Sequence, residues 1–176
     1  MLPIRSSGRS AVKLARLLAL MIAVAAGLSA GRPAAATDVP HAVVLMYHRF
    51  GESSLPSTNI RLDQLEAHIA ELKSAAFNVW PLDRIINHIK ANEPLPDRTI
   101  AITIDDAYAS VYHQAWPRFR TANLPFTVFV STDQVGRSDN YLTWDQIREM
   151  QAAGVLIGHH GAAHGHMANA TSNSIS

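Results

Sequence analysis

The sequence predicts an α/β fold with a parallel β-sheet. Within residues 41–158, short apolar segments rich in β-branched residues alternate with longer segments whose apolar residues recur at helical spacing. If the helical segments between two strands are counted as one connection, the order is strand, helix, strand, helix, strand, helix, strand. Three of the four expected strands end in polar residues. Because ligands gather at the carboxyl ends of the strands in such folds, we expect these polar residues to form one site.

The first half of this region contains one expected strand and two expected helices. The segment at 41–48 is too short for a helix and continuously apolar at its centre, so it is expected to be a strand buried on both faces. Apolar residues recur at helical spacing in 62–77, with charged residues between them. A short extended segment at 78–82 leads into a further helix at 82–90, which two following prolines bring to an end.

Three strands and two helices are expected in the second half. The strands are predicted at 99–104, 126–130 and 155–158. The first helix, at 108–122, contains Pro117, which predicts a bend or a late start. The second, at 143–154, begins with Thr143 and Gln146 in the pattern of a capping box. This helix leads into the last expected strand.

The first 36 residues have the pattern of a cleaved secretory signal. A basic, acid-free head precedes the apolar run LLALMIAVAAGLSA, and Ala34 and Ala36 supply the small residues of a cleavage site. The apolar run is shorter than the about 20 residues that a spanning helix needs, which favours export over a membrane anchor. Residues 37–176 are therefore expected to be periplasmic or secreted, with no stable membrane anchor after cleavage.

The composition of residues 37–176 limits the function classes. Five of the fifteen lysines and arginines lie in the expected signal, so ten remain against fourteen acidic residues, a formal net charge of −4. No basic patch is left that predicts binding to nucleic acid. The chain has no cysteine, which excludes disulfides and a lipid-modified cysteine. The 140 residues after the signal are enough for one core and not for two domains.

Four histidines follow the last expected strand in the segment GHHGAAHGH, namely His159, His160, His164 and His166. The glycines among them predict a loop, because glycine is costly in a helix. Neutral imidazole is a good ligand for zinc and neighbouring transition metals, so His160 and His164 are candidate ligands. The alternative is a solvated loop without a ligand. His159 and His166 have no predicted role.

Asp105 and Asp106 directly follow the strand expected at 99–104. Two carboxylates at the end of an apolar strand are costly unless something compensates their charge. They could instead lie in a solvent-facing turn, with Asp106 capping the next helix. Together with two histidines, however, one carboxylate completes a metal site with open positions, and its neighbour can accept a proton. Metal-activated water beside a carboxylate base is the chemistry of amide or ester hydrolysis.

These motifs resemble those of the polysaccharide deacetylases, carbohydrate esterase family four, whose domain is also called the nodulation-protein-B homology domain. AITIDDAY resembles the first family motif, written T-F-D-D-G, and IGHHGAAHGHM resembles the second, in which a histidine and a hydroxyl residue precede a further histidine. VVLMYHRF and the helical segment after it resemble the start of the same domain in exported bacterial members. The resemblance covers residues 41–169.

The resemblance implies a distorted (β/α) barrel with parallel strands, of which residues 37–176 would be the N-terminal part. It implies a hydrolase that removes N-acetyl groups from chitin-like, poly-N-acetylglucosamine or peptidoglycan sugars, so the expected partner is an acetylated carbohydrate. By position, Asp105 would be the catalytic base that takes a proton from the metal-bound water. Asp106, His160 and His164 would be the ligands of a divalent metal ion, with zinc expected.

Two departures from the family pattern concern single residues. Ala107 replaces the glycine of the first motif, which is a mild change if the backbone there is not at positive φ. Gly161 replaces the hydroxyl residue after the first metal-binding histidine, so a side-chain hydrogen bond that steadies the loop is expected to be missing. The loss of such supporting contacts typically costs about 10–100-fold in metal affinity or activity.

A third departure concerns the later family motifs, which carry the general acid and the groups that support the base. These motifs are not found before Ser176, so the domain is expected to be truncated at its C-terminus. A barrel with about half of its strands would have unpaired edges and an uncovered apolar face. Two alternatives to an active enzyme therefore stay open, an impaired remnant that binds metal or glycan and a fragment that does not fold.

Overall fold

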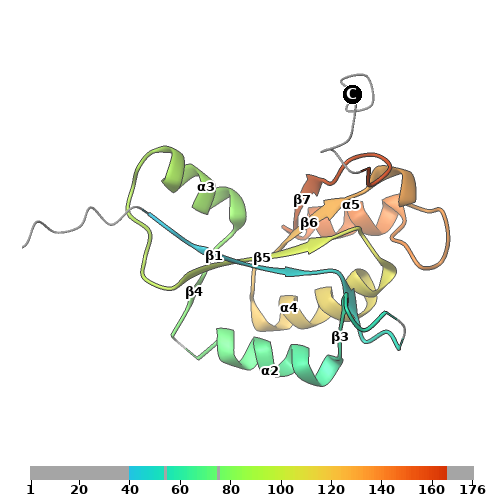
Figure 1. Ribbon diagram of the computed structural model, residues 1–176, viewed down its shortest axis with the longest axis horizontal. Coiled ribbons are helices and arrows are strands. Elements are labelled where there is room, and N and C mark those ends of the chain that lie inside the picture. The colour runs from blue at the N-terminus through green and yellow to red at the C-terminus, as the bar shows by residue number, and fades with distance from the viewer. Residues whose placement is uncertain (1–39, 54, 75, 166–176) are drawn as a thin grey trace, which may run out of the picture. The chain divides into compact units, whose positions relative to one another are not determined.

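The structure is a computed structural model that describes residues 40–53, 55–74 and 76–165 (Figure 1). The signal peptide predicted at 1–36 and the flanking residue His166 lie outside this part of the chain. Within it, no helix is both long enough and apolar enough to cross a membrane.

The strands and helices alternate as the sequence predicts. The first half contains β1 (Val43–Tyr47), β2 (Arg49–Phe50), β3 (Asn59–Ile60), α2 (Leu62–Leu72), β4 (Asn78–Val79), α3 (Leu82–Lys90) and β5 (Thr99–Asp105). The second half contains the π-helical turn η1 (Val111–Ala115), α4 (Trp116–Ala122), β6 (Thr127–Val130), the 3-10 turn η2 (Thr132–Gln134), α5 (Trp144–Ala152) and β7 (Leu156–His159).

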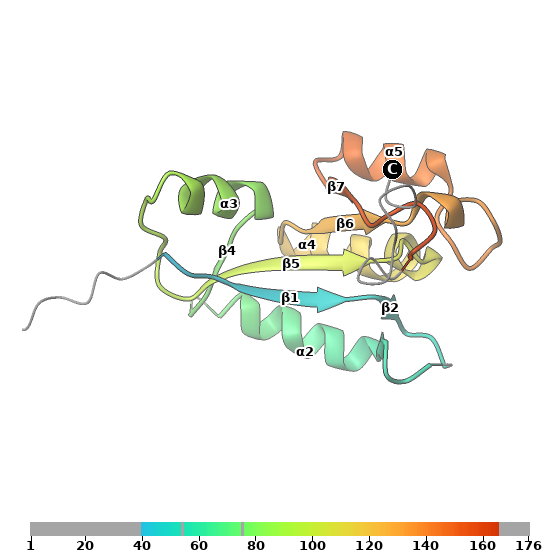
Figure 2. The ribbon, with the colours of Figure 1, turned by 45° about the horizontal axis from the view of Figure 1, so that its top comes forward.

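The main sheet is parallel throughout, with the strand order β1-β5-β6-β7, and β4 pairs with the first residues of β5 (Figures 1 and 2). In register, Tyr47 lies opposite Ile104, and Val130 lies opposite His159. The carboxyl ends of the strands therefore lie along one edge of the sheet. This arrangement confirms the predicted α/β fold with parallel strands. A separate parallel pair is formed by β2 and β3.

The core lies between the main sheet and three helices. β5 is its centre, with every residue from Thr99 to Ile104 buried. Figure 1 shows α2 and α4 side by side below the sheet, and α5 packs beside β7. The helices bury Leu65, Ile69 and Leu72 from α2, Trp116 and Phe119 from α4, and Ile147 and Met150 from α5. Removing this apolar surface from water is the main force that holds the helices on the sheet.

The prediction that the first strand is buried on both faces is wrong. Val44 is 51% exposed and Met46 is 61% exposed, whereas Leu45 and Tyr47 pack against the core. In the part of the chain that the structure describes, β1 lies at the end of the sheet and pairs with β5 alone. A continuous apolar run thus shows that one face is covered but does not show that both are.

The two helices predicted in the second half are confirmed. The helix predicted at 108–122 is the π-helical turn η1 continued directly by α4, which begins at Trp116 with Pro117 in its first turn. α5 begins with the predicted capping box, in which the Gln146 backbone N–H donates to the Thr143 hydroxyl (3.2 Å) and the Thr143 N–H donates to the Gln146 side chain (2.9 Å). These two bonds satisfy backbone donors that a helix start leaves without partners.

The helix predicted at 62–77 is shorter than expected, because α2 ends at Leu72. The helical spacing of its buried residues also stops at Leu72. Phe77 is not part of the helix, but its side chain packs against the core. An apolar residue beyond the last helical turn therefore does not indicate that the helix continues.

Candidate metal centre

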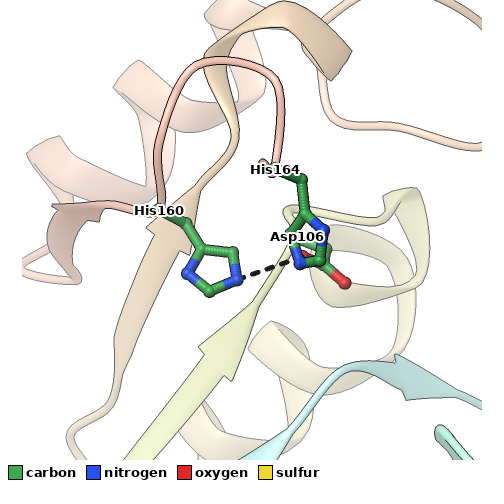
Figure 3. A group of neighbouring side chains, drawn as sticks. All are labelled: Asp106, His160 and His164. Carbon is green, nitrogen blue, oxygen red and sulfur yellow. Dashed lines mark ion pairs between the residues drawn. The ribbon is translucent and has the colours of Figure 1, made fainter. Parts of the chain in front are cut away.

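Asp106, His160 and His164 lie together at the carboxyl edge of the main sheet (Figure 3). Asp106 stands in the turn after β5, and both histidines stand in the loop after β7. The Nε2 atoms of His160 and His164 lie 3.4 Å and 3.2 Å from Asp106 Oδ1. One ligand atom of each residue lies within 4.8 Å of those of the other two. The structure thus brings together the three residues that the sequence indicates as metal ligands.

The environment of Asp106 fits a cation. Its Oδ1 atom is buried and has no hydrogen-bond partner among the described residues. A buried carboxylate oxygen without a donor is costly, and a divalent ion between it and two imidazoles would compensate that cost. Two imidazole nitrogens and one carboxylate oxygen also form a donor set that suits zinc and related metals. The predicted alternative, in which Asp106 caps the next helix, is wrong, because η1 and α4 have no side-chain cap.

The three side chains of the group differ in their exposure to solvent. The Asp106 side chain is 13% exposed, His160 is 31% exposed and His164 is 54% exposed. The carboxylate therefore lies at the bottom of the group and His164 lies at the solvent side. The group is thus open to solvent at His164, whereas Asp106 is shielded from water.

The turn that carries Asp106 has an uncommon backbone conformation. Asp106 has a φ of 71° and Ala107 a φ of 57°, so two consecutive residues are left-handed. Aspartate tolerates this conformation better than most residues, but for alanine it costs about 1–2 kcal/mol. The condition under which the Ala107 substitution would be mild is therefore not met. Ala107 is fully buried, so its methyl group also contributes to the core.

We expect Ala107→Gly to change the free energy of unfolding by less than about 1 kcal/mol. Relief of the left-handed strain, about 1 kcal/mol, offsets the loss of a buried methyl group and the greater freedom of glycine in the unfolded chain. Ala101→Gly is the matched control, because Ala101 is equally buried but lies in extended β5. It should cost about 1.5–2 kcal/mol. Urea unfolding measures both changes, and equal losses would contradict the strain at Ala107.

The loop that carries the histidines is held by β6 and the turn after it. The His160 backbone N–H donates to the Val130 carbonyl (2.9 Å), and the buried Ser131 hydroxyl lies 3.4 Å from the His160 carbonyl oxygen that accepts from it. Two backbone N–H groups of η2 continue the contact, Thr132 to the Gly161 carbonyl (3.3 Å) and Asp133 to the Ala162 carbonyl (3.0 Å). The support that the sequence predicts to be missing at Gly161 thus comes from another segment.

Two glycines are required by the local geometry of this loop. Gly161 has a φ of +78°, which a side chain would strain even though the space around it is open. Gly158 lies in β7, and a Cβ atom there would stand 2.5 Å from Cδ1 of Phe129 in β6. Its absence lets β7 pack closely beside the Phe129 ring, which fixes the strand from which His160 emerges.

Asp105, the predicted base, is the last residue of β5 and directly precedes Asp106. It is half-buried, and no hydrogen bond or ion pair joins its side chain to another described residue. His159 is exposed and is not brought into the group; its Nδ1 accepts a hydrogen bond from the Gly161 N–H (3.3 Å). Tyr47, at the end of β1, is hydrogen-bonded to Nδ1 of His68 (2.9 Å). The catalytic role of Asp105 stays a prediction.

The structure also shows a stack of one arginine and two tyrosine side chains beside Asp106, which the sequence does not predict. The Arg49 guanidinium lies 3.5 Å from the centre of the Tyr108 ring, and Tyr108 stacks on Tyr141 with ring centres 5.1 Å apart. Burial raises the pKa of Tyr108, and the nearby Asp106 charge raises it further, while Arg49 acts in the opposite direction. Tyr108 is therefore a neutral phenol at neutral pH. No local pattern links these three segments, which are distant in sequence.

The chain is similar in sequence to polysaccharide deacetylases. Residues 92–176 match the model of the family described as polysaccharide deacetylase. YxkH of Bacillus subtilis (strain 168), whose name assigns it to the same family, is 26% identical over 121 residues, which are 69% of this chain and 42% of YxkH.

Solved structures share the fold. The chain is similar to IcaB from Ammonifex degensii, with a TM-score of 0.63 and 29% identity over 69% of this chain and 53% of that one. It is also similar to a de-N-acetylase from Aggregatibacter actinomycetemcomitans, with a TM-score of 0.63 and 23% identity over 76% of this chain and 59% of the other. The chain thus spans about half the length of the relatives that it matches.

Proposed function

Because the chain belongs to the polysaccharide deacetylase family, we propose that it is a metal-dependent hydrolase that removes N-acetyl groups from acetylated amino-sugar polymers or oligosaccharides. Chitin-like, poly-N-acetylglucosamine and peptidoglycan sugars are the proposed substrates. The metal is proposed to be zinc, and the protein is proposed to act after export, in the periplasm or outside the cell.

One observation carries this proposal. The buried Asp106 Oδ1 atom has no hydrogen-bond partner among the described residues, and two imidazole Nε2 atoms lie within 3.4 Å of it. This arrangement is costly as a structural contact and favourable as the ligand set of a divalent ion. Two protein nitrogens and one oxygen leave coordination positions open, as a catalytic site requires.

The residues have separate tasks in the proposed reaction. Asp106 provides the negative charge that holds the ion, and His160 and His164 fix its position. When bound, the ion supplies Lewis-acid chemistry that polarises the acetamide carbonyl. Asp105 accepts the proton of the attacking water, because its half-buried carboxylate lies at the end of β5, directly before Asp106, and has no other partner among the described residues. The C–N bond then breaks, the amino nitrogen takes up the proton that Asp105 had accepted, and acetate leaves the amino sugar.

Acetate release from N-acetylglucosamine oligosaccharides tests the proposed function. We expect release with the zinc-loaded protein, loss of release after removal of the metal with a chelator, and recovery when zinc is added back. Residual release by the metal-free protein should be at least about 100-fold lower, since the ion provides several kcal/mol of charge stabilisation. Zinc binding without acetate release would contradict the enzyme and favour a metal-binding remnant.

A further inference from the structure

Arg49, Tyr108 and Tyr141 form a three-layer stack beside the metal centre, which we call the aromatic platform. The Arg49 guanidinium covers one ring of the pair, 3.5 Å from the centre of Tyr108. The rings of Tyr108 and Tyr141 are 5.1 Å apart and inclined by 28°. Offset stacking of this kind and a cation over a ring each contribute about 0.5–1.5 kcal/mol, so the three side chains hold one another in place.

The backbone makes this platform rigid. Tyr108 and Tyr141 form an antiparallel bridge. On either side of it the Ala109 N–H donates to the Asn140 carbonyl (2.8 Å) and the Leu142 N–H donates to the Ala107 carbonyl (3.0 Å). The loop between β6 and α5 is thereby fastened to the turn that carries Asp106. The stacked rings cannot shift without moving that turn.

Glu52 holds the Arg49 guanidinium in place. Its Nη1 atom donates to Oε2 of Glu52 at 2.7 Å, and the Ser110 hydroxyl donates to Oε1 of the same carboxylate, also at 2.7 Å. The Arg49 Nε atom is buried and has no hydrogen-bond partner among the described residues. Burying an unpartnered donor costs stability, and features that cost stability concentrate at functional sites.

The platform is next to the metal centre through Tyr108. Tyr108 is two residues from Asp106, and the charge of Asp106 acts on its hydroxyl. Tyr108 is covered by Arg49 on one side and by Tyr141 on the other. Tyr141 is only half-buried, and no second ring or cation of the described residues stacks on it. The part of Tyr141 that stays exposed is therefore available to a ligand.

We propose that this platform is a sugar subsite, on which a ring next to the one being deacetylated stacks against Tyr141. The apolar C–H face of a pyranose packs on an aromatic ring, while its hydroxyl groups stay in water. A rigid tyrosine loses little conformational freedom when a ligand binds, so such a ring is an effective anchor. This inference rests on the proposed function for the position of the reacting acetyl group.

Replacement of Tyr141 tests the subsite. Tyr141→Leu keeps an apolar side chain but removes the ring, and Tyr141→Phe keeps the ring. Tyr112→Leu is the matched control, because Tyr112 contacts the Trp116 ring and is hydrogen-bonded to Glu149, and it is not part of the platform. Binding of a β-1,4-linked N-acetylglucosamine tetrasaccharide is measured by calorimetry in the Asp105→Asn background. We expect Tyr141→Leu to weaken binding about tenfold and the other two variants to change it less than threefold.

The kinetic test separates a subsite from a structural contact. In the Asp105-containing protein, Tyr141→Leu should raise KM for the tetrasaccharide about tenfold and affect kcat/KM for p-nitrophenyl acetate much less, since that ester has no second sugar. Equal losses on both substrates, or an unchanged tetrasaccharide affinity, would overturn the subsite. Tyr141-dependent binding without any acetate release would refute the proposed function but keep the subsite. Absence of tetrasaccharide binding by the unaltered protein would overturn the subsite as well.

Discussion

Asp105→Asn is expected to abolish acetate release while leaving zinc affinity within about threefold of the unaltered chain. Asparagine has nearly the same shape as aspartate but cannot accept the proton of the attacking water. General-base catalysis contributes about 10²–10⁴-fold, so kcat for deacetylation should fall by that factor. Acetate release from the tetrasaccharide and calorimetric titration with zinc measure the two quantities on one preparation.

The absence of an ion pair or hydrogen bond to the Asp105 side chain among the described residues supports this separation, because the substitution removes no side-chain contact. The unfolding curve should therefore stay close to that of the unaltered chain. A variant that keeps more than about a third of the activity would show that another group accepts the proton. A parallel loss of zinc affinity would place Asp105 among the ligands.

The second large effect is expected for Asp106→Asn, which should weaken zinc binding at least about 100-fold. The change removes the only negative charge among the three predicted ligands, and it does so at a carboxylate that is 13% exposed and poorly screened by water. Loss of a group that merely supports a ligand typically costs 10–100-fold, so loss of the ligand charge should cost at least as much. Acetate release should fall with metal occupancy.

Asparagine also tolerates the left-handed backbone of position 106, where φ is 71°, so the variant tests the charge and not the turn. His159→Ala is the control for the loop, because His159 is exposed and stands next to the group without joining it. It should bind zinc within about threefold of the unaltered chain. If His159→Ala lost zinc as strongly as Asp106→Asn did, the choice of ligands in the loop would be wrong.

Much of the fold could be predicted because its signals are local. β5 is β-branched and uncharged until Asp105, and the capping box at Thr143 marks the start of α5 within four residues. Once the strands are parallel, their carboxyl ends must lie along one edge. That geometry explains why Asp106 and His160, more than fifty residues apart, could be paired from the sequence.

The exposure of β1 could not be predicted, because it depends on what covers the strand. Val44 and Met46 are as apolar as the buried residues of β5, yet both are more than half exposed. The positive φ of Ala107 could not be predicted either. Alanine is normally right-handed or extended, and only the bonds that fasten this turn to Asn140 and Leu142 hold it at positive φ.

The contacts that support the metal centre could not be predicted from the sequence, because they too depend on tertiary packing. Ser131, which follows β6, donates a hydrogen bond to the carbonyl of His160, which follows β7. Nothing in the sequence around either residue indicates this contact. The stack of Arg49, Tyr108 and Tyr141 joins three segments that are far apart in the sequence. Ligands can be recognised by their chemistry, whereas the side chains that position them are set by tertiary packing.

The central claim, that Asp106 with His160 and His164 holds the metal on which hydrolysis depends, is tested most directly by zinc titration of the two aspartate variants side by side. Asp105→Asn and Asp106→Asn are the same chemical change at adjacent positions, so differences in folding or expression are small. We predict one zinc ion per chain with unaltered affinity in Asp105→Asn, and an affinity at least about 100-fold weaker in Asp106→Asn. Equal affinities in the two variants would contradict the account.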